Sequence, residues 1–341
     1  MLMEYMLCLG FNQNDIDAVV NCYALKDYKE ETLCAKVKEI YEFLLKCGYK
    51  RNEIINMTRE YYGIFAITVE HIVERMNYMV ELGYSYKQFM RMTTKLPLLY
   101  NYSNEYIKKV YENLLSLGYD KEQVKTITIK FPQIYCLSTD TINIKINGLM
   151  NLGFNKNQIL KMIFVRPQLL GYDTEKIKDK IDTLVRIGHK KAEVIKMTMS
   201  FPAIVSLNTD RLIQRVDDIV TLGYTREETL HFLYRLPTFY GLDMETIVEK
   251  KNFYDSVGLG ELFLKHIGTM MQGVETSYAR YMYLKTIGIE ITIDNFKLIV
   301  CGNKLFEKKF GKTRDELISQ FNYYKDIGKI RKKTKNIKSD E

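Results

Sequence analysis

The spacing of the prolines constrains the fold of this chain more than any other feature of its sequence. The chain has 341 residues and only five prolines, and each proline follows the previous one by 35 residues. A fixed period of this length is typical of stacked supersecondary units. The prolines are Pro97, Pro132, Pro167, Pro202 and Pro237. The spacing therefore predicts a solenoid, which grows in one dimension and needs no single central core.

Glycines follow the same period and define the start of each repeat. Each of five glycines lies 14 residues before a proline, and Gly48 and Gly258 extend the series by one period at its two ends. The five are Gly83, Gly118, Gly153, Gly188 and Gly223. We number positions within a repeat as offsets, with the glycine at offset 0.

Each repeat predicts two helices separated by the proline. In the repeat that begins at Gly118, apolar residues recur at spacings of three and four, which is typical of amphipathic helices. The first helix is expected from about offset 4 to offset 12. It ends there because proline cannot extend it and restricts the residue before it. Proline is, however, well suited to the first position of a new, short helical turn.

The second helix has a clear start signal in every proline repeat. Offset 20 is a good N-cap residue each time, namely Ser103, Ser138, Asp173, Asn208 and Asp243. Offset 22 is always acidic, namely Glu105, Asp140, Glu175, Asp210 and Glu245, and an acid in the first turn favours the helix dipole. We interpret these acids as helix starts rather than as a ligand or catalytic row. The next glycine can close the helix in the left-handed conformation.

These signals predict the organisation of the whole chain. We expect degenerate N-terminal capping repeats over 1–47 and six helical repeats over 48–257. Degenerate C-terminal capping repeats over 258–328 and a basic, disordered tail over 329–341 should follow. The tyrosines Tyr100, Tyr135 and Tyr240 could stack on bases, but Leu170 and Val205 occupy the same offset. This exchange with aliphatic residues favours burial between repeats.

Composition limits the classes of function. The net charge is +8, but without the tail the body carries 44 basic and 40 acidic residues, a net charge of +4. Any argument for nucleic-acid binding must therefore depend on where the charges lie. The six cysteines and four histidines follow no metal-ligand spacing, so we expect no metal and no cofactor. No phosphate-binding glycine loop and no local nucleophile with a base occurs, which argues against an enzyme.

The repeat pattern resembles the mitochondrial transcription termination factor (mTERF) family. The matching features are the "LG" opening, a helix, a proline followed by "xLL" or "xIY", a polar cap and "xxLxxxxxxLxxLG" before the next repeat. They cover about residues 40–260. The resemblance implies an all-α fold, a right-handed-type α-solenoid superhelix. It also implies a positively charged groove that holds double-stranded DNA or, in some members, RNA, with roles in transcription, termination or ribosome biogenesis.

A groove that binds nucleic acid should show basic residues in phase with the repeat. Offsets 8 and 12 lie one helical turn apart and share a face of the first helix. We select the residues at and beside these offsets as the candidate site, because this row is poor in acids: Arg91, Lys95, Lys125, Lys130, Lys161, Arg166, Lys196 and Arg235. A second row lies at offsets 26 and 27, in Lys109, Lys145, Lys180, Arg215 and Lys250, with Glu249 and Asp217 close by. A third lies at offset 3, in Arg51, Lys121, Lys156, Lys191 and Arg226.

We therefore expect a non-catalytic protein that binds nucleic acid, with DNA favoured over RNA, and that acts in transcription or RNA metabolism. The alternative is a protein-interaction scaffold that uses the same solenoid surface. We expect a monomer with no small-molecule substrate and no membrane partner. The N-terminal "MLMEYMLCLGF" resembles neither a secretory signal nor an import peptide. This favours the cytoplasm, with a mitochondrion or plastid as the alternative if an import peptide is missing.

Overall fold

The protein is built entirely from helices in the part of the chain that the structure describes. The computed structural model describes residues 1–263 and 265–328, and no strand occurs among them. The chain divides into two compact units, unit 1 over Met1–Lys178 and unit 2 over Asp179–Glu341. The predicted all-α helical-repeat fold is confirmed, whereas the predicted tail at 329–341 lies outside the described residues.

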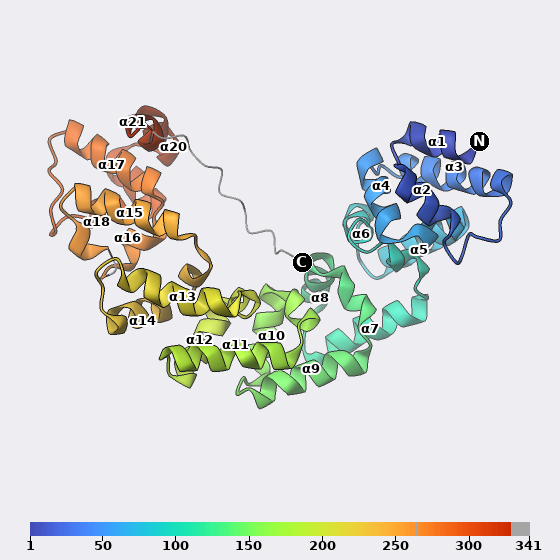
Figure 1. Ribbon diagram of the computed structural model, residues 1–341, viewed down its shortest axis with the longest axis horizontal. Helices are drawn as coiled ribbons and strands as arrows, with labels where there is room; N and C mark the ends of the chain where they lie inside the picture. Colours follow the sequence, from blue (N-terminus) through green and yellow to red (C-terminus); the bar gives the residue numbers. More distant parts are fainter. Residues whose placement is uncertain (264, 329–341) are drawn as a thin grey trace. The chain divides into compact units, whose positions relative to one another are not determined.

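Unit 1 consists of helix pairs joined by short 3-10 helices (Figure 1). Its first helices are α4 (Arg51–Glu60), α6 (Tyr86–Thr93), α8 (Lys121–Lys130) and α10 (Lys156–Val165). The 3-10 helices are η1 (Tyr62–Ala66), η2 (Pro97–Asn101), η3 (Pro132–Cys136) and η4 (Pro167–Gly171). The second helices are α3 (Glu30–Lys46), α5 (Val69–Glu81), α7 (Asn104–Leu117), α9 (Thr139–Asn151) and α11 (Thr174–Ile187), which continues into unit 2.

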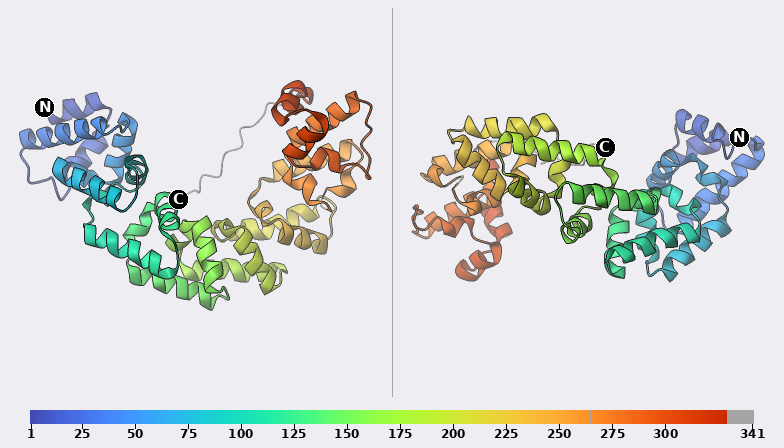
Figure 2. Two further views of the ribbon diagram at one scale, coloured as in Figure 1. Left: turned by 180° about the vertical axis from the view of Figure 1, so that it is seen from behind. Right: turned by 90° about the horizontal axis from the view of Figure 1, so that it is seen from below.

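The N-terminal end of unit 1 adds α1 (Leu2–Leu9) and α2 (Gln13–Val20), which pack together and, through α1, against α3 (Figure 2). An ion pair joins this end to the first repeat. The Arg59 guanidinium donates from Nε and Nη2 to the Asp15 carboxylate, both at 2.9 Å. This two-point contact lowers the pKa of Asp15 and holds α2 against α4.

Unit 2 continues the pattern and then departs from it. Its regular elements are α12 (Lys191–Ser200), η5 (Pro202–Ser206), α13 (Thr209–Val220), α14 (Arg226–Arg235), η6 (Pro237–Gly241) and α15 (Met244–Ser256). The C-terminal elements are η7 (Gly260–Leu262), α16 (Ile267–Met271), α17 (Val274–Thr286), α18 (Lys297–Val300), α19 (Asn303–Phe310), α20 (Arg314–Gln320) and α21 (Tyr323–Asp326). The helix α17 packs against α15, α18, α20 and α21. None of the helices described in either unit combines the length and the apolar content that a bilayer crossing requires.

The local signals in the sequence set the helix ends. Every repeat proline begins a 3-10 helix, and the first helices start at offset 3, one residue earlier than expected. The Ser103 side chain accepts a hydrogen bond from the backbone N–H of Tyr106 at 3.1 Å, which caps α7 as predicted. Gly118 ends the same helix with φ of +117°, a conformation that glycine adopts without steric cost.

The core between repeats contains tyrosines whose hydroxyl groups form hydrogen bonds with neighbouring side chains. Tyr100, Tyr135 and Tyr240 are each 0% exposed, which confirms that they pack in the core and are not surfaces for base stacking. In unit 1 the Tyr49 hydroxyl lies 2.7 Å from the Tyr100 hydroxyl and 2.6 Å from the Thr93 hydroxyl. Each of these three hydroxyls therefore has a partner from a neighbouring repeat, which removes the cost of leaving it without a hydrogen bond.

Candidate nucleic-acid interface

The eight candidate residues, which we call the first-helix row, lie on or directly after first helices. Six of them have exposed side chains: Arg91, Lys95, Lys130, Lys161, Lys196 and Arg235. The other two, Lys125 and Arg166, are half-buried. The row therefore presents most of its positive charge to solvent, where a phosphate can reach it.

In unit 1 the residues at offset 12 form a continuous line. The Lys95 Nζ donates to the backbone carbonyl of Lys130 at 3.3 Å, and Gln133 Nε2 donates to the Lys95 carbonyl at 3.3 Å. The Lys130 Nζ in turn donates to the Phe164 carbonyl at 3.1 Å and lies 5.1 Å from the centre of the Phe164 ring. The ends of α6, α8 and α10 are thus adjacent, so the cations they carry lie on one surface.

These lysines also stabilise the stack. Each ammonium group meets a carbonyl in the last turn of the next first helix, where the helix dipole is negative. An ammonium group has three donors, so one bond to a carbonyl leaves donors for an anion. Partial burial and the nearby positive charge of Arg91 lower the pKa of Lys95. A bound phosphate would relieve this repulsion.

The structure does not bring Lys125 and Arg166 into the exposed line. The Lys125 Nζ lies 2.5 Å from a carboxylate oxygen of Glu122 and donates to the Gly83 carbonyl at 3.2 Å. It therefore joins two repeats at the glycine turn. Arg166 follows α10 directly and is half-buried beside Pro167.

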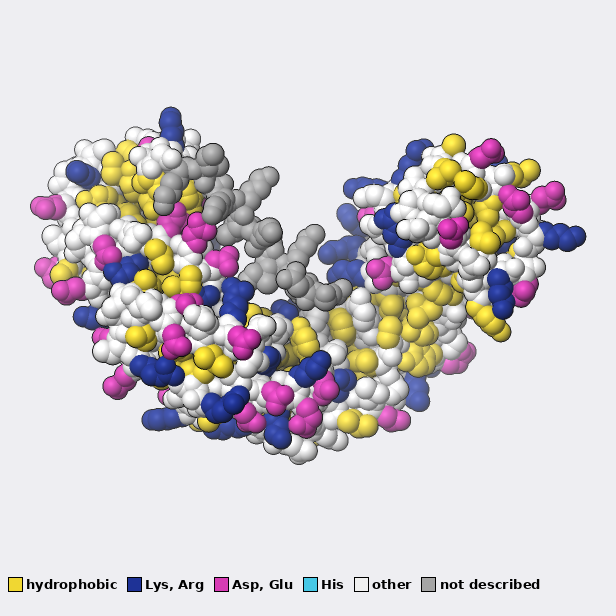
Figure 3. Space-filling view, viewed as in Figure 1, with side chains coloured by type: hydrophobic (Ala, Val, Ile, Leu, Met, Phe, Trp, Pro, Cys, Tyr) yellow, Lys and Arg dark blue, Asp and Glu magenta, His cyan; other side chains and the backbone are white. Residues whose placement is uncertain are grey.

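Unit 2 carries two members of the row, on helices that pack against each other. Lys196 lies on α12 and Arg235 ends α14. Ser200 occupies offset 12 in α12, where unit 1 has Lys95 and Lys130. The positive charge is therefore sparser in unit 2 than in unit 1, where Figure 3 shows Lys and Arg side chains gathered over α4 and α6.

The basic residues at offset 27 of the second helices do not form a solvated row. Arg215 and Lys250 are buried, Lys145 and Lys180 are half-buried, and Lys109, at offset 26, is exposed. The Lys145 Nζ donates to the Tyr172 carbonyl at 2.7 Å, just before the next second helix. Similar bonds, each to a group in the following repeat, are Lys180 to Thr209, Arg215 to Leu242 and Lys250 to Met270. In the repeat that begins at Gly48, Arg75 at offset 27 bonds in the same way to Asn104.

We call these five residues (Arg75, Lys145, Lys180, Arg215 and Lys250) the buried cation ladder. Burial lowers the pKa of Arg75 and Arg215, and it lowers the pKa of Lys250 to about 8. The sequence did contain a signal for this burial. Val110 occupies offset 27 in one repeat, and an aliphatic residue there indicates a buried position.

The third row, at offset 3, begins the first helices. Arg51, Lys121, Lys156, Lys191 and Arg226 are all exposed, and each is the first residue of its helix. A cation at this end opposes the helix dipole, and acids in the same turn offset it. Arg226 pairs with Asp217 at 3.3 Å. The row at offset 3 is therefore exposed, but nearby acids neutralise more of its positive charge than they do in the first-helix row.

Stacked helical pairs with a line of exposed cations define a helical-repeat protein with a basic face. No group of His, Cys, Asp and Glu side chains that could hold a metal occurs among residues 1–263 and 265–328. The mTERF family model matches residues 2–151 and 137–257, so the chain belongs to the mTERF family. Among curated proteins, none matches this chain.

Proposed function

We propose that this protein binds nucleic acid without catalysis, through the exposed members of the first-helix row. Membership of the mTERF family supports nucleic-acid binding in general. The observation that carries the proposal is the line from Lys95 to Lys130 and Phe164, which joins cations of successive repeats on one surface of unit 1. We favour double-stranded DNA over RNA, and a role in transcription termination or its regulation over one in RNA metabolism.

Binding should depend mainly on phosphate contacts and therefore on salt. Cations that neutralise phosphates release counterions, and on duplex DNA the log–log slope is about −0.9 for each phosphate contacted. Phosphate contacts position a protein but carry no sequence information. The row holds only three arginines, Arg91, Arg166 and Arg235, and arginine is the usual reader of guanine. We therefore expect weak sequence specificity.

A protein-interaction scaffold is the second candidate, and one observation favours it. Offset 32 of the second helices is apolar in five successive repeats, and four of its members have side chains more than a third exposed. They are Val80 (39%), Met150 (39%), Val185 (38%) and Val220 (36%). An exposed apolar position that recurs in phase with the repeat suits a protein partner.

The first test is a salt titration of binding to labelled duplex DNA and to single-stranded RNA of the same length. It compares the full chain with a chain that ends at Asp326. Binding to one polymer that is steep in salt and persists in the shortened chain supports the repeats as the site and identifies the polymer. Binding that disappears with the tail would refute the proposal and leave the repeats to a protein partner.

A matched pair of variants then locates the surface. The first is Arg91→Gln/Lys161→Gln/Lys196→Gln, whose three side chains are exposed and form no hydrogen bond or ion pair with the described residues. The control is Lys121→Gln/Lys156→Gln/Lys191→Gln, which removes the same charge at offset 3, about 140° around the helix. Only the first variant should lower the salt slope, by about 0.9 for each lost contact. A larger effect in the control would assign the site to the row at offset 3.

A further inference from the structure

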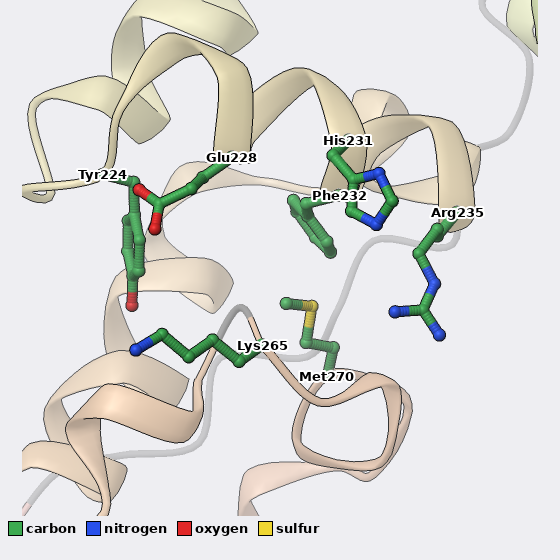
Figure 4. Close-up of a pocket in the computed structure, with 7 residues that line it drawn as sticks. All are labelled: Tyr224, Glu228, His231, Phe232, Arg235, Lys265 and Met270. Atoms are coloured by element: carbon green, nitrogen blue, oxygen red, sulfur yellow. The ribbon is translucent and has the colours of Figure 1, made fainter.

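Unit 2 contains a cavity of about 230 Å³ beside α14 that the repeat pattern does not predict (Figure 4). The break in the repeat explains it. In the regular repeats a helix spans offsets 3 to 12 and packs on the first helix before it, as α14 packs on α12. After Gly258 the corresponding residues form only the end of η7 and most of α16, a helix of five residues. Gly268 lies within these residues, at offset 10, and a glycine weakens the interior of a helix.

The cavity has an apolar middle and polar ends. Figure 4 shows Phe232 and Met270 between two groups of polar side chains. Both apolar side chains are buried, at 3% and 1% exposure. The Arg235 guanidinium lies at one end, near His231, and the Lys265 ammonium lies at the other, beside Tyr224 and Glu228.

The polar side chains that line the cavity differ in whether they already form hydrogen bonds or ion pairs. The Glu228 carboxylate accepts hydrogen bonds from the backbone N–H and the hydroxyl of Thr225, both at 2.9 Å. By contrast, the side chains of His231, Arg235 and Lys265 form no hydrogen bond or ion pair with the residues that the structure describes. The cavity therefore offers unused donors around an apolar surface. Behind the lining residues, the buried Lys250 donates to the carbonyl of Met270 at 2.5 Å.

We propose that this cavity is a binding site for a small organic anion with a flat apolar body, such as an aryl phosphate. The anionic group meets Arg235 and His231, because a guanidinium holds a phosphate or carboxylate by two parallel hydrogen bonds. The ring lies against Phe232 and Met270, where apolar surface leaves water. Lys265 lies at the far end, where it favours a second acceptor on the ligand. The site goes beyond the proposed nucleic-acid binding, since its ligand is a free small molecule.

The test uses phenyl phosphate as the probe and the full chain labelled with ¹³C at the methionine methyl groups. Phenyl phosphate should shift the Met270 methyl resonance saturably, while the neighbouring Met271, which is 71% exposed, reports only nonspecific effects. Inorganic phosphate and phenol, added separately, should each bind at least tenfold more weakly, because each provides only one of the two kinds of contact. A saturable Met270 shift of equal midpoint with inorganic phosphate would refute a site for an organic anion.

Variants locate the two ends of the site. Arg235→Gln and Lys265→Gln change exposed side chains, so the fold should persist, and thermal unfolding checks this. Arg235→Gln should weaken phenyl phosphate binding at least tenfold, and Lys265→Gln should weaken it severalfold. Lys285→Gln, an exposed cation outside the cavity, should leave binding unchanged. Equal binding in all three variants, or no saturable shift in the unaltered chain, would overturn the proposal.

Discussion

The Nε2 atom of His189 lies 2.8 Å from the hydroxyl oxygen of Tyr240, and both side chains are buried in unit 2. The same two repeat offsets hold Tyr49 and Tyr100 in unit 1, whose hydroxyl oxygens are 2.7 Å apart. A histidine thus replaces a tyrosine in a buried hydrogen bond between repeats. Because histidine can gain a proton near neutral pH and tyrosine cannot, this one contact makes the stability of unit 2 sensitive to acid.

Burial lowers the pKa of His189 to about 4, although Glu193 nearby acts in the opposite direction. The native ring is therefore neutral, while in the unfolded chain it gains a proton below its ordinary pKa of about 6.5. The stability of the native state should fall as the pH decreases from about 6.5 to 4. We expect a loss of about 2 kcal/mol between pH 7 and pH 5, measured by urea unfolding.

The control for this pH dependence is His189→Phe/Tyr240→Phe, which removes the titrating ring together with the hydroxyl that it meets. Phe154 occupies the position of His189 in the preceding repeat, so the repeat accepts phenylalanine there. The variant should lose most of the dependence between pH 7 and pH 5. An unchanged slope would show that another group causes it.

The buried tyrosine pair in unit 1 should behave as a coupled unit. Tyr49→Phe should destabilise the protein by about 1–3 kcal/mol, because the Tyr100 hydroxyl then loses a partner inside the core. Tyr100→Phe should cost less, because the Tyr49 hydroxyl keeps the Thr93 hydroxyl as a partner. The double variant should cost less than the sum of the two, as measured by equilibrium unfolding. Strict additivity would mean that the 2.7 Å contact contributes no coupling.

Lys250 of the buried cation ladder predicts a second pH effect, of the same sign but at alkaline pH. The pKa of Lys250 is about 8 in the native state because burial disfavours its charge, whereas its ordinary value is 10.5. Between these values the native lysine is neutral while the unfolded one is charged, so stability rises with pH. We expect Lys250 to contribute a gain of about 2 kcal/mol between pH 7.5 and pH 9.5, measured as the difference between the unaltered chain and a variant without this lysine.

Lys250→Met is the control for the ladder, since methionine fills the space of the lysine stem without its charge. It should remove the rise in stability between pH 7.5 and pH 9.5. Replacing a buried charge by an apolar side chain is often neutral or stabilising, so we expect little loss at pH 7. A wild-type slope retained in this variant would contradict the assignment.

The repeat glycines should differ in their tolerance of a side chain. Gly188 and Gly223 both have positive φ, at +129° and +94°, and alanine there is strained by about 1–2 kcal/mol. A Cβ at Gly188 would also lie 2.8 Å from Leu230 Cδ1, whereas at Gly223 it would meet nothing within 4 Å. Thermal unfolding should therefore show a larger loss for Gly188→Ala than for Gly223→Ala. Equal losses would mean that Leu230 moves without cost.

The sequence predicted the repeat architecture well because its signals are local. A proline starts a 3-10 helix, a serine such as Ser103 caps the next helix, and a glycine such as Gly118 ends it, all through contacts within a few residues. Burial of Tyr100, Tyr135 and Tyr240 was also predictable, since other repeats have aliphatic residues at the same offset. For the candidate site, the sequence identified a basic helix face but could not show which of its cations bond to a neighbouring repeat and which stay exposed.

The period, the helix ends and the apolar faces could thus be predicted, because each depends on the preferences and spacing of residues that are close in the chain. By contrast, the burial and the bonding partners of the charged side chains depend on how the repeats pack. Lys145 and Lys250 are tied to the following repeat and Lys125 to the preceding one, whereas Lys161 and Lys196 stay exposed. The cavity that the missing helix after Gly258 leaves beside α14 also depends on this packing. These outcomes depend on contacts between residues about 20 to 45 positions apart, which local patterns do not encode.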